Sequence, residues 1–143
     1  GSTVEFLRRD FEASKSARWK LLMHHRPMWS ASNHGSNLML QQYWQPIVDE
    51  YHVDLVLNGH EHAYEITKPL VGQTVMPSMV DATVYVVAGG AGAELYASGT
   101  GFWTQYSEST HNAGLVRVRR DQLTFEAYRP DGTVLPGAFT KTK

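Results

Sequence analysis

The stretch 54–65 constrains the fold most, because it predicts a buried strand that ends at a polar turn with two histidines. The apolar run Leu55-Val56-Leu57 is typical of a buried strand, and Asn58-Gly59 after it is a turn signal. His60 and His62 follow, one residue apart. If the backbone stays near extended, both imidazoles face the same side, where they are suited to hold a metal ion. An isolated His-x-His is more often only a polar turn.

A second strand with histidines at its end favours the metal interpretation. Residues 19–23 predict a strand that enters the core and stops at His24-His25-Arg26-Pro27, because proline cannot donate to a sheet ladder. Residues 28–37 are small, polar and turn-prone, which predicts a loop, and His34 lies in it. Two strand ends with histidines can meet at one edge of a sheet, where functional loops gather.

The remaining elements divide the chain into two parts. Helices are expected over residues 3–16 and 38–51, with Pro46 either kinking the second or marking a new first turn. Residues 89–112 are expected to form an irregular loop. Strands are expected near residues 54–57, 64–68, 83–88, 114–119, 122–129 and, as a short edge strand, 133–135. The first half is therefore predicted to be α/β and the second half mostly antiparallel β.

Composition limits the possible functions. A length of 143 residues fits one domain with a modest core. The net charge of −1 lacks the basic excess that nucleic-acid binding requires, and no apolar run is long enough to span a bilayer, so neither a nucleic acid nor a membrane is expected as a partner. Because the chain has no cysteine, any metal must be held by histidine and by oxygen ligands.

The two histidine blocks, in this order and with a helix-like sequence between them, resemble those of the calcineurin-like metallophosphoesterase superfamily, and within it the purple acid phosphatases. The first block is Leu22-Met23-His24-His25 followed by Arg26-Pro27-Met28, and the second is Gly59-His60-Glu61-His62. The segment 84–92 is similar to the strand and glycine turn that follow the site in that family, and residues 114–135 resemble its terminal hairpin.

The family's three earlier blocks, which supply its aspartates, an asparagine and a tyrosine, are not found in the sequence. The resemblance therefore implies that residues 1–143 are the C-terminal portion of a catalytic domain. The expected fold class is α/β: half of a four-layer α-β-β-α sandwich, with a β-rich C-terminal part and about one of the two sheets. The N-terminal half would be a partner, either covalently joined or a separate chain.

The resemblance also assigns roles to single residues. His25, the histidine followed by x-Pro, is expected to bind one metal together with His60, and His62 to bind a second. The expected cofactors are two divalent or trivalent ions, iron with zinc, manganese or a second iron. Imidazole is a suitable ligand for such ions. Two ions clamp the attacking and leaving oxygens of a phosphoryl displacement.

His34, nine residues after His25, is either a solvated loop residue or the catalytic histidine that contacts phosphate and protonates the leaving alcohol. Glu61 lies between two expected ligands and, by alternation, is predicted to point away from them. The turn Gly89-Gly90-Ala91-Gly92 lacks the lysine of a P-loop and is expected to be only a turn.

The resemblance implies a dinuclear-metal phosphatase that hydrolyses phosphate monoesters once the chain is joined to its N-terminal half, with the isolated chain inactive. The alternatives are a phosphodiesterase of the same superfamily and a non-catalytic half-domain that needs a complement chain. A carbohydrate- or protein-binding β domain is a third hypothesis, and it predicts no metal. The resemblance favours a secreted or other extracytoplasmic location.

Overall fold

A computed structural model describes residues 2–143 of the chain. Its helices are α1 (Thr3–Ala13), α2 (Leu38–Tyr43) and α3 (Gln45–Glu50). Its strands are β1 (Leu21–His24), β2 (Leu55–Asn58), β3 (Tyr64–Thr67), β4 (Leu70–Val71), β5 (Thr74–Val75), β6 (Val84–Ala88), β7 (Thr104–Glu108), β8 (Ala113–Val118), β9 (Gln122–Tyr128) and β10 (Phe139–Thr142). They form a five-stranded sheet in the order β1-β2-β6-β3-β7, a three-stranded sheet in the order β10-β9-β8, and the small hairpin β4-β5.

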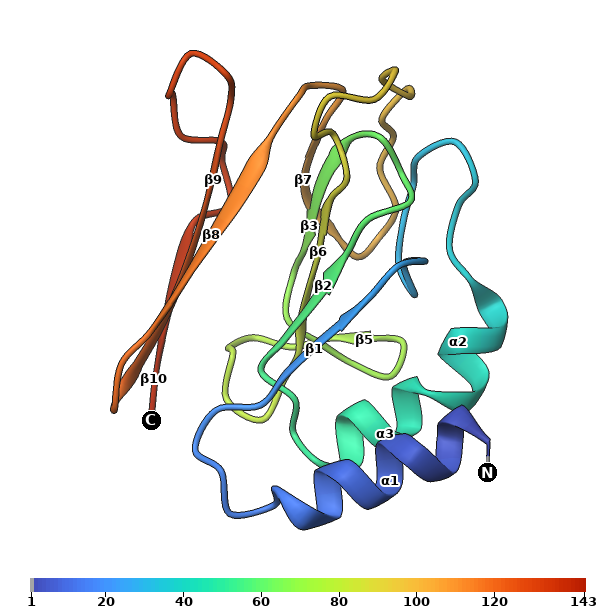
Figure 1. The fold of residues 1–143 in the computed structure, drawn as a ribbon, viewed down its shortest axis with the longest axis vertical. Helices are drawn as coiled ribbons and strands as arrows, with labels where there is room; N and C mark the ends of the chain where they lie inside the picture. The colour runs from blue at the N-terminus through green and yellow to red at the C-terminus, as the bar shows by residue number, and fades with distance from the viewer. Residues whose placement is uncertain (1) are drawn as a thin grey trace.

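The elements are arranged in layers. The helices lie on one side of the five-stranded sheet, and the three-stranded sheet lies on its other side (Figure 1). Within the five-stranded sheet, β1, β2 and β6 run parallel, whereas β3 and β7 are antiparallel to their neighbours. This mixed α/β arrangement agrees with the predicted fold class. The expectation of about one sheet was wrong, because the C-terminal hairpin and β10 form a second sheet of their own.

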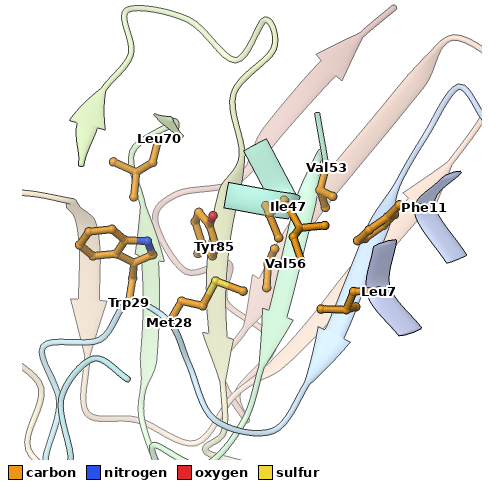
Figure 2. Close-up of a cluster of buried hydrophobic side chains, with 10 residues drawn as sticks. Leu7, Phe11, Met28, Trp29, Ile47, Val53, Val56, Leu70 and Tyr85 are labelled. Carbon is orange, nitrogen blue, oxygen red and sulfur yellow. The ribbon is translucent and has the colours of Figure 1, made fainter. Parts of the chain in front are cut away.

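Strand alternation gives the five-stranded sheet two buried faces, and therefore two hydrophobic cores. On the helical side, Val56 of β2 and Tyr85 of β6 pack with Leu7 and Phe11 of α1 and with Ile47 of α3 (Figure 2). On the other side, the residues of β2, β3 and β6 that point away from the helices pack against β9. They are Leu55, Tyr64, Ile66, Val84 and Val86, with Leu123, Phe125 and Ala127 opposite. The central strands are apolar on both faces for this reason.

The predicted helices are present, with shorter bounds. Ser2 caps α1 in a capping box with Glu5, and the helix ends at Ala13, three residues before the predicted end. Pro46 lies in the first turn of α3, where its missing N–H is not needed, so the predicted 38–51 helix is split into α2 and α3.

Two of the strand predictions were wrong. Strand β7 lies inside the segment 89–112 that was expected to be irregular, and it pairs with β3. The last strand is β10 rather than residues 133–135, of which Val134 forms only an isolated bridge to Tyr128. Both strands are polar and gain their hydrogen bonds from partners distant in sequence, so the local sequence pattern does not reveal them.

The parallel strands bring their carboxyl ends to one edge of the sheet. His24, the last residue of β1, pairs in register with Asn58, the last of β2, and Asn58 pairs with Val87 of β6. The segments that follow these strands are therefore neighbours, although they lie far apart in the sequence. The two histidine blocks and the glycine turn all begin at this edge.

Among the described residues, none of the helices has the length and apolar character needed to cross a membrane.

Candidate metal centre

A side-chain contact between the two histidine blocks joins His25 to His60. Nε2 of His25 lies 3.2 Å from Nδ1 of His60, and the ring centroids are 5.0 Å apart. Two nitrogen ligands at about 2.0–2.1 Å from one tetrahedral ion are about 3.4 Å apart, so this pair has the separation that a shared ion requires. The pKa of His60 is lowered, first by burial and then by the neighbouring His34, which favours the neutral ring that binds metals.

His24, the alternative ligand in the first block, does not lie beside His60. Its ring packs edge-on against Trp44, and Nδ2 of Asn58 lies 3.2 Å from its Nε2. Burial lowers the pKa of His24 to about 4, so the ring is neutral and part of the packing under the site. Because His24 is the last residue of β1 and His25 lies beyond it, the end of the strand directs His25 toward the second block.

The backbone of the second block is not extended, contrary to the condition on which the sequence argument rested. His60 has φ of 68°, in the left-handed region that non-glycine residues seldom adopt. This turn breaks the alternation, so Glu61 does not point away from the site as predicted. Its side chain is fully buried, and its carboxylate contacts the main chain and ring of His34.

The glycine turn after β6 packs directly under this block. A Cβ added to Gly89 would lie 2.1 Å from the carbonyl oxygen of Glu61, so only glycine permits this approach. Backbone hydrogen bonds join Gly89 N–H to Ala63 O and Gly59 N–H to His25 O. The turn is therefore a support for the histidine loop, which agrees with the prediction that it is not a P-loop.

His62 is separated from His34 by the ring of Tyr96, which contacts both. Its Nδ1 is 2.8 Å from the carbonyl oxygen of Glu94, a contact that assigns the ring proton to Nδ1 and leaves Nε2 free to bind an ion. The ring stacks on Tyr96, with centroids 4.2 Å apart, and Tyr96 in turn lies 5.4 Å from the ring of His34. Tyr96 belongs to the segment 89–112 and was not identified from the sequence, since no local pattern marks it.

His34 lies beside the paired histidines. Its ring centroid is 4.7 Å from that of His60. The loop that carries it is fixed at its start, where the buried carboxylate of Glu65 accepts hydrogen bonds from Ser30 Oγ and Ala31 N–H. A small pocket of about 100 Å³ lies between this loop and the second block, lined by Arg26, Pro27, His34, Gly35, Ser36, Asn37 and His60.

The structure thus brings His25, His34 and His60 together and connects His62 to them through Tyr96. A different trio, His34, His60 and Glu61, offers ligand atoms that all lie within 4.8 Å of one another. Both sets contain His60. The Glu61 carboxylate is hydrogen-bonded to His34, and the ring nitrogens of His25 and His60 face each other.

Comparisons with known proteins show what this chain is similar to. The family model for calcineurin-like phosphoesterases matches residues 2–64, which contain both histidine blocks. An uncharacterized protein of Mycobacterium tuberculosis is 38% identical over 101 residues, which cover 59% of this chain and 18% of that protein. Purple acid phosphatase 3 of Arabidopsis thaliana is 30% identical over 83 residues, which cover 58% of this chain and 20% of the phosphatase.

The fold is also shared with a solved structure. The purple acid phosphatase PPD1 from yellow lupin (Lupinus luteus) seeds superposes with a TM-score of 0.87 at 22% identity, covering 99% of this chain and 28% of that chain. This chain spans about a fifth of the length of the curated relatives it matches.

The chain is therefore similar to the calcineurin-like phosphoesterases over residues 2–64, and it shares the fold of a purple acid phosphatase. Its relatives include purple acid phosphatases, which confirms the resemblance recognised from its two histidine blocks.

Proposed function

We propose that this chain forms the C-terminal portion of a metal-dependent phosphatase that hydrolyses phosphate monoesters. The observation that carries the proposal is the 3.2 Å separation of His25 Nε2 and His60 Nδ1, two ligand nitrogens from loops 35 residues apart. His62, oriented by the carbonyl of Glu94, is proposed to serve a second ion. Iron paired with zinc, manganese or a second iron suits imidazole ligands of this kind.

The proposed role of each residue follows from where its side chain lies. Bound ions would supply positive charge for the phosphate oxygens and activate water. His25, His60 and His62 would hold them. His34, whose ring adjoins that of His60, would contact the phosphate and donate a proton to the leaving alcohol.

The chain on its own provides only part of such a site, since a two-metal centre needs more ligands than three histidines. An apolar groove of about 560 Å³ supports the need for a complement. It lies between the open edges of the two sheets and is lined by Met23, His24, His25, Leu57, Asn58, Gly59, Ala88, Gly114, Val116 and Phe125. We propose that the N-terminal half of the domain, covalently joined or as a separate chain, covers this groove and adds the missing ligands.

Zinc, manganese and iron salts added to the 143-residue chain, followed by assay with a chromogenic phosphate monoester, test the proposal. We expect the chain alone to bind metal but to turn over little, and the protein completed with its N-terminal half to be active. A His60→Ala change should lower the affinity for metal at least 10-fold. His52→Ala, a change at an exposed histidine in the turn between α3 and β2, is the matched control.

Metal binding that His60→Ala leaves unchanged would contradict the proposed centre. Substantial turnover by the isolated chain would contradict the need for a complement.

Family resemblance is also the basis on which we propose a secreted or other extracytoplasmic location.

A further inference from the structure

Glu61 is a fully buried carboxylate, and the hydrogen bonds that its side chain makes with the described residues all go to His34. Its oxygens lie 3.1 and 3.2 Å from the main-chain nitrogen of His34, and Oε1 lies 3.1 Å from Nδ1 of the ring. Burying a carboxylate is costly unless it is hydrogen-bonded, and here one residue supplies that compensation.

This contact fixes the ring of His34 in two ways. A carboxylate next to Nδ1 selects the form that carries a proton there, which leaves Nε2 as the atom that faces outward. The second bond, from the main chain of the same residue, fixes the backbone from which the ring extends. The ring lies beside His60, 4.7 Å away, and Tyr96, 5.4 Å away, both measured between ring centroids.

We propose that Glu61 is a positioning residue for His34: it selects the Nδ1–H form and directs Nε2 toward the phosphate ester. This inference deepens the proposed function and rests on it. Glu61 acts through His34 and does not itself touch the substrate, whereas His34 is the residue that meets the leaving oxygen.

The rest of the loop does not need Glu61 for its conformation. Its start is held by Glu65, which accepts from Ser30 and Ala31, and its end by the hydrogen bond from Asn37 N–H to Pro27 O. The His34 side chain itself is 47% exposed, so no burial of the ring compensates for the buried charge. A buried carboxylate serving an exposed imidazole is therefore better explained by orientation of the ring than by stability.

The first test measures the ring directly and needs neither metal nor substrate. Long-range proton–nitrogen NMR spectra of the 143-residue chain, recorded at about pH 8.5 where free imidazole is neutral, report which nitrogen of His34 carries the proton. We expect Nδ1–H in the parent chain and in Glu61→Gln, whose side-chain oxygen still accepts. In Glu61→Ala we expect a mixture of the two forms.

The second test uses the protein completed with its N-terminal half, loaded with metal, and two esters. An alkyl phosphate needs a proton on its leaving oxygen, whereas nitrophenyl phosphate has a stable leaving anion. For Glu61→Ala we expect kcat on the alkyl ester to fall about 10- to 100-fold. We expect a fall of less than about threefold on nitrophenyl phosphate and little change in KM, with Glu61→Gln recovering most of the loss.

Two controls separate positioning from damage to the fold. Glu50→Gln removes the same charge from an exposed carboxylate at the end of α3, where it pairs with Arg8, and it should leave both esters unaffected. The double change Glu61→Ala with His34→Ala should be no worse on the alkyl ester than His34→Ala alone, because both residues act in one unit.

Equal losses on both esters, or an unchanged Nδ1–H signal in Glu61→Ala, would overturn the proposal. A parent protein without phosphatase activity would instead refute the proposed function, and the NMR result would still decide whether Glu61 orients His34.

Discussion

At the scale of single residues, the left-handed backbone at His60 determines where the side chains of His60, Glu61 and His62 point. In an extended segment, His60 and His62 would share one side and Glu61 would face the other. With φ of 68° at His60, the carboxylate of Glu61 instead turns inward beneath His34. One backbone angle therefore determines whether Glu61 is a solvated residue or part of the site.

This backbone conformation depends on Gly89, which leads to a prediction. Gly89→Ala places a Cβ only 2.1 Å from the carbonyl oxygen of Glu61, so the histidine loop must move. We expect a loss of about 1–3 kcal/mol in the free energy of unfolding. We also expect weaker metal binding by at least several-fold, measured by isothermal titration with zinc.

The control for this change is Gly72→Ala in the β4-β5 turn. Gly72 has a positive φ, of 53°, and no atom lies within 4 Å of its added Cβ. It should lower stability by about 1 kcal/mol and leave metal affinity unchanged. Equal metal affinities for the two variants would show that Gly89 does not support the site.

At the scale of elements, an ion pair joins the two sheets at the end that carries the candidate metal centre. Arg129, just after β9, donates from Nε and Nη2 to both carboxylate oxygens of Glu108 in β7, at 2.8 and 2.6 Å. Hydrogen bonds from Arg129 and Tyr106 lower the pKa of Glu108 to about 2. A bidentate pair of this kind fixes orientation as well as contributing energy.

The lowered pKa predicts a particular dependence of stability on pH. A carboxyl whose folded pKa lies below its unfolded value of about 4.5 stabilises the fold above pH 4.5. That contribution is lost as the pH falls from about 4.5 to about 2. In Glu108→Gln we expect a lower urea midpoint at pH 6 and a smaller further decrease between pH 4.5 and 3 than in the parent chain.

The control for this measurement is Glu5→Gln, which removes a carboxylate at the start of α1, away from the junction of the sheets. If Glu108→Gln loses as much stability as the parent chain over the same pH interval, the pair does not make the proposed contribution.

At the scale of the whole molecule, the open edges of the sheets are the main feature. Among residues 2–143, β1 pairs only with β2 and β8 only with β9. Met23 on the first edge is 77% exposed and Val118 on the second is 51% exposed. Unpaired edges with exposed apolar side chains are templates for pairing with another strand.

The isolated chain should therefore self-associate at micromolar concentrations, as sedimentation velocity would detect. Met23→Lys combined with Val118→Lys should shift the distribution toward monomer, because charges on an edge oppose strand pairing. Phe6→Lys, at an apolar side chain of α1 that is 51% exposed and lies on no edge, should leave association unchanged. A monomeric parent chain, or an equal effect of Phe6→Lys, would contradict this explanation.

The N-terminal half of the domain, added as a separate chain, should compete with this self-association, because we propose that it covers the same edges. If it has no effect on the distribution, the groove is not where the complement binds.

Much of the fold follows from local sequence. The apolar runs at 55–57 and 84–87 predict buried strands, Ser2 and Glu5 predict the start of α1, and Pro46 predicts the break between α2 and α3. These features depend on neighbours within a few residues. Strands β7 and β10 depend on partners far away in the chain, so the sequence pattern alone did not predict them.

The same division applies to the candidate site. The sequence by itself determined which residue types are present and that His25, His34, His60 and His62 follow strand ends, because motifs and strand patterns are local. Only the tertiary structure decided that His25 rather than His24 meets His60, and that Glu61 turns inward to His34. The physical reason is that these contacts depend on the register of β1 with β2 and on the close packing of Gly89, which join segments distant in the chain.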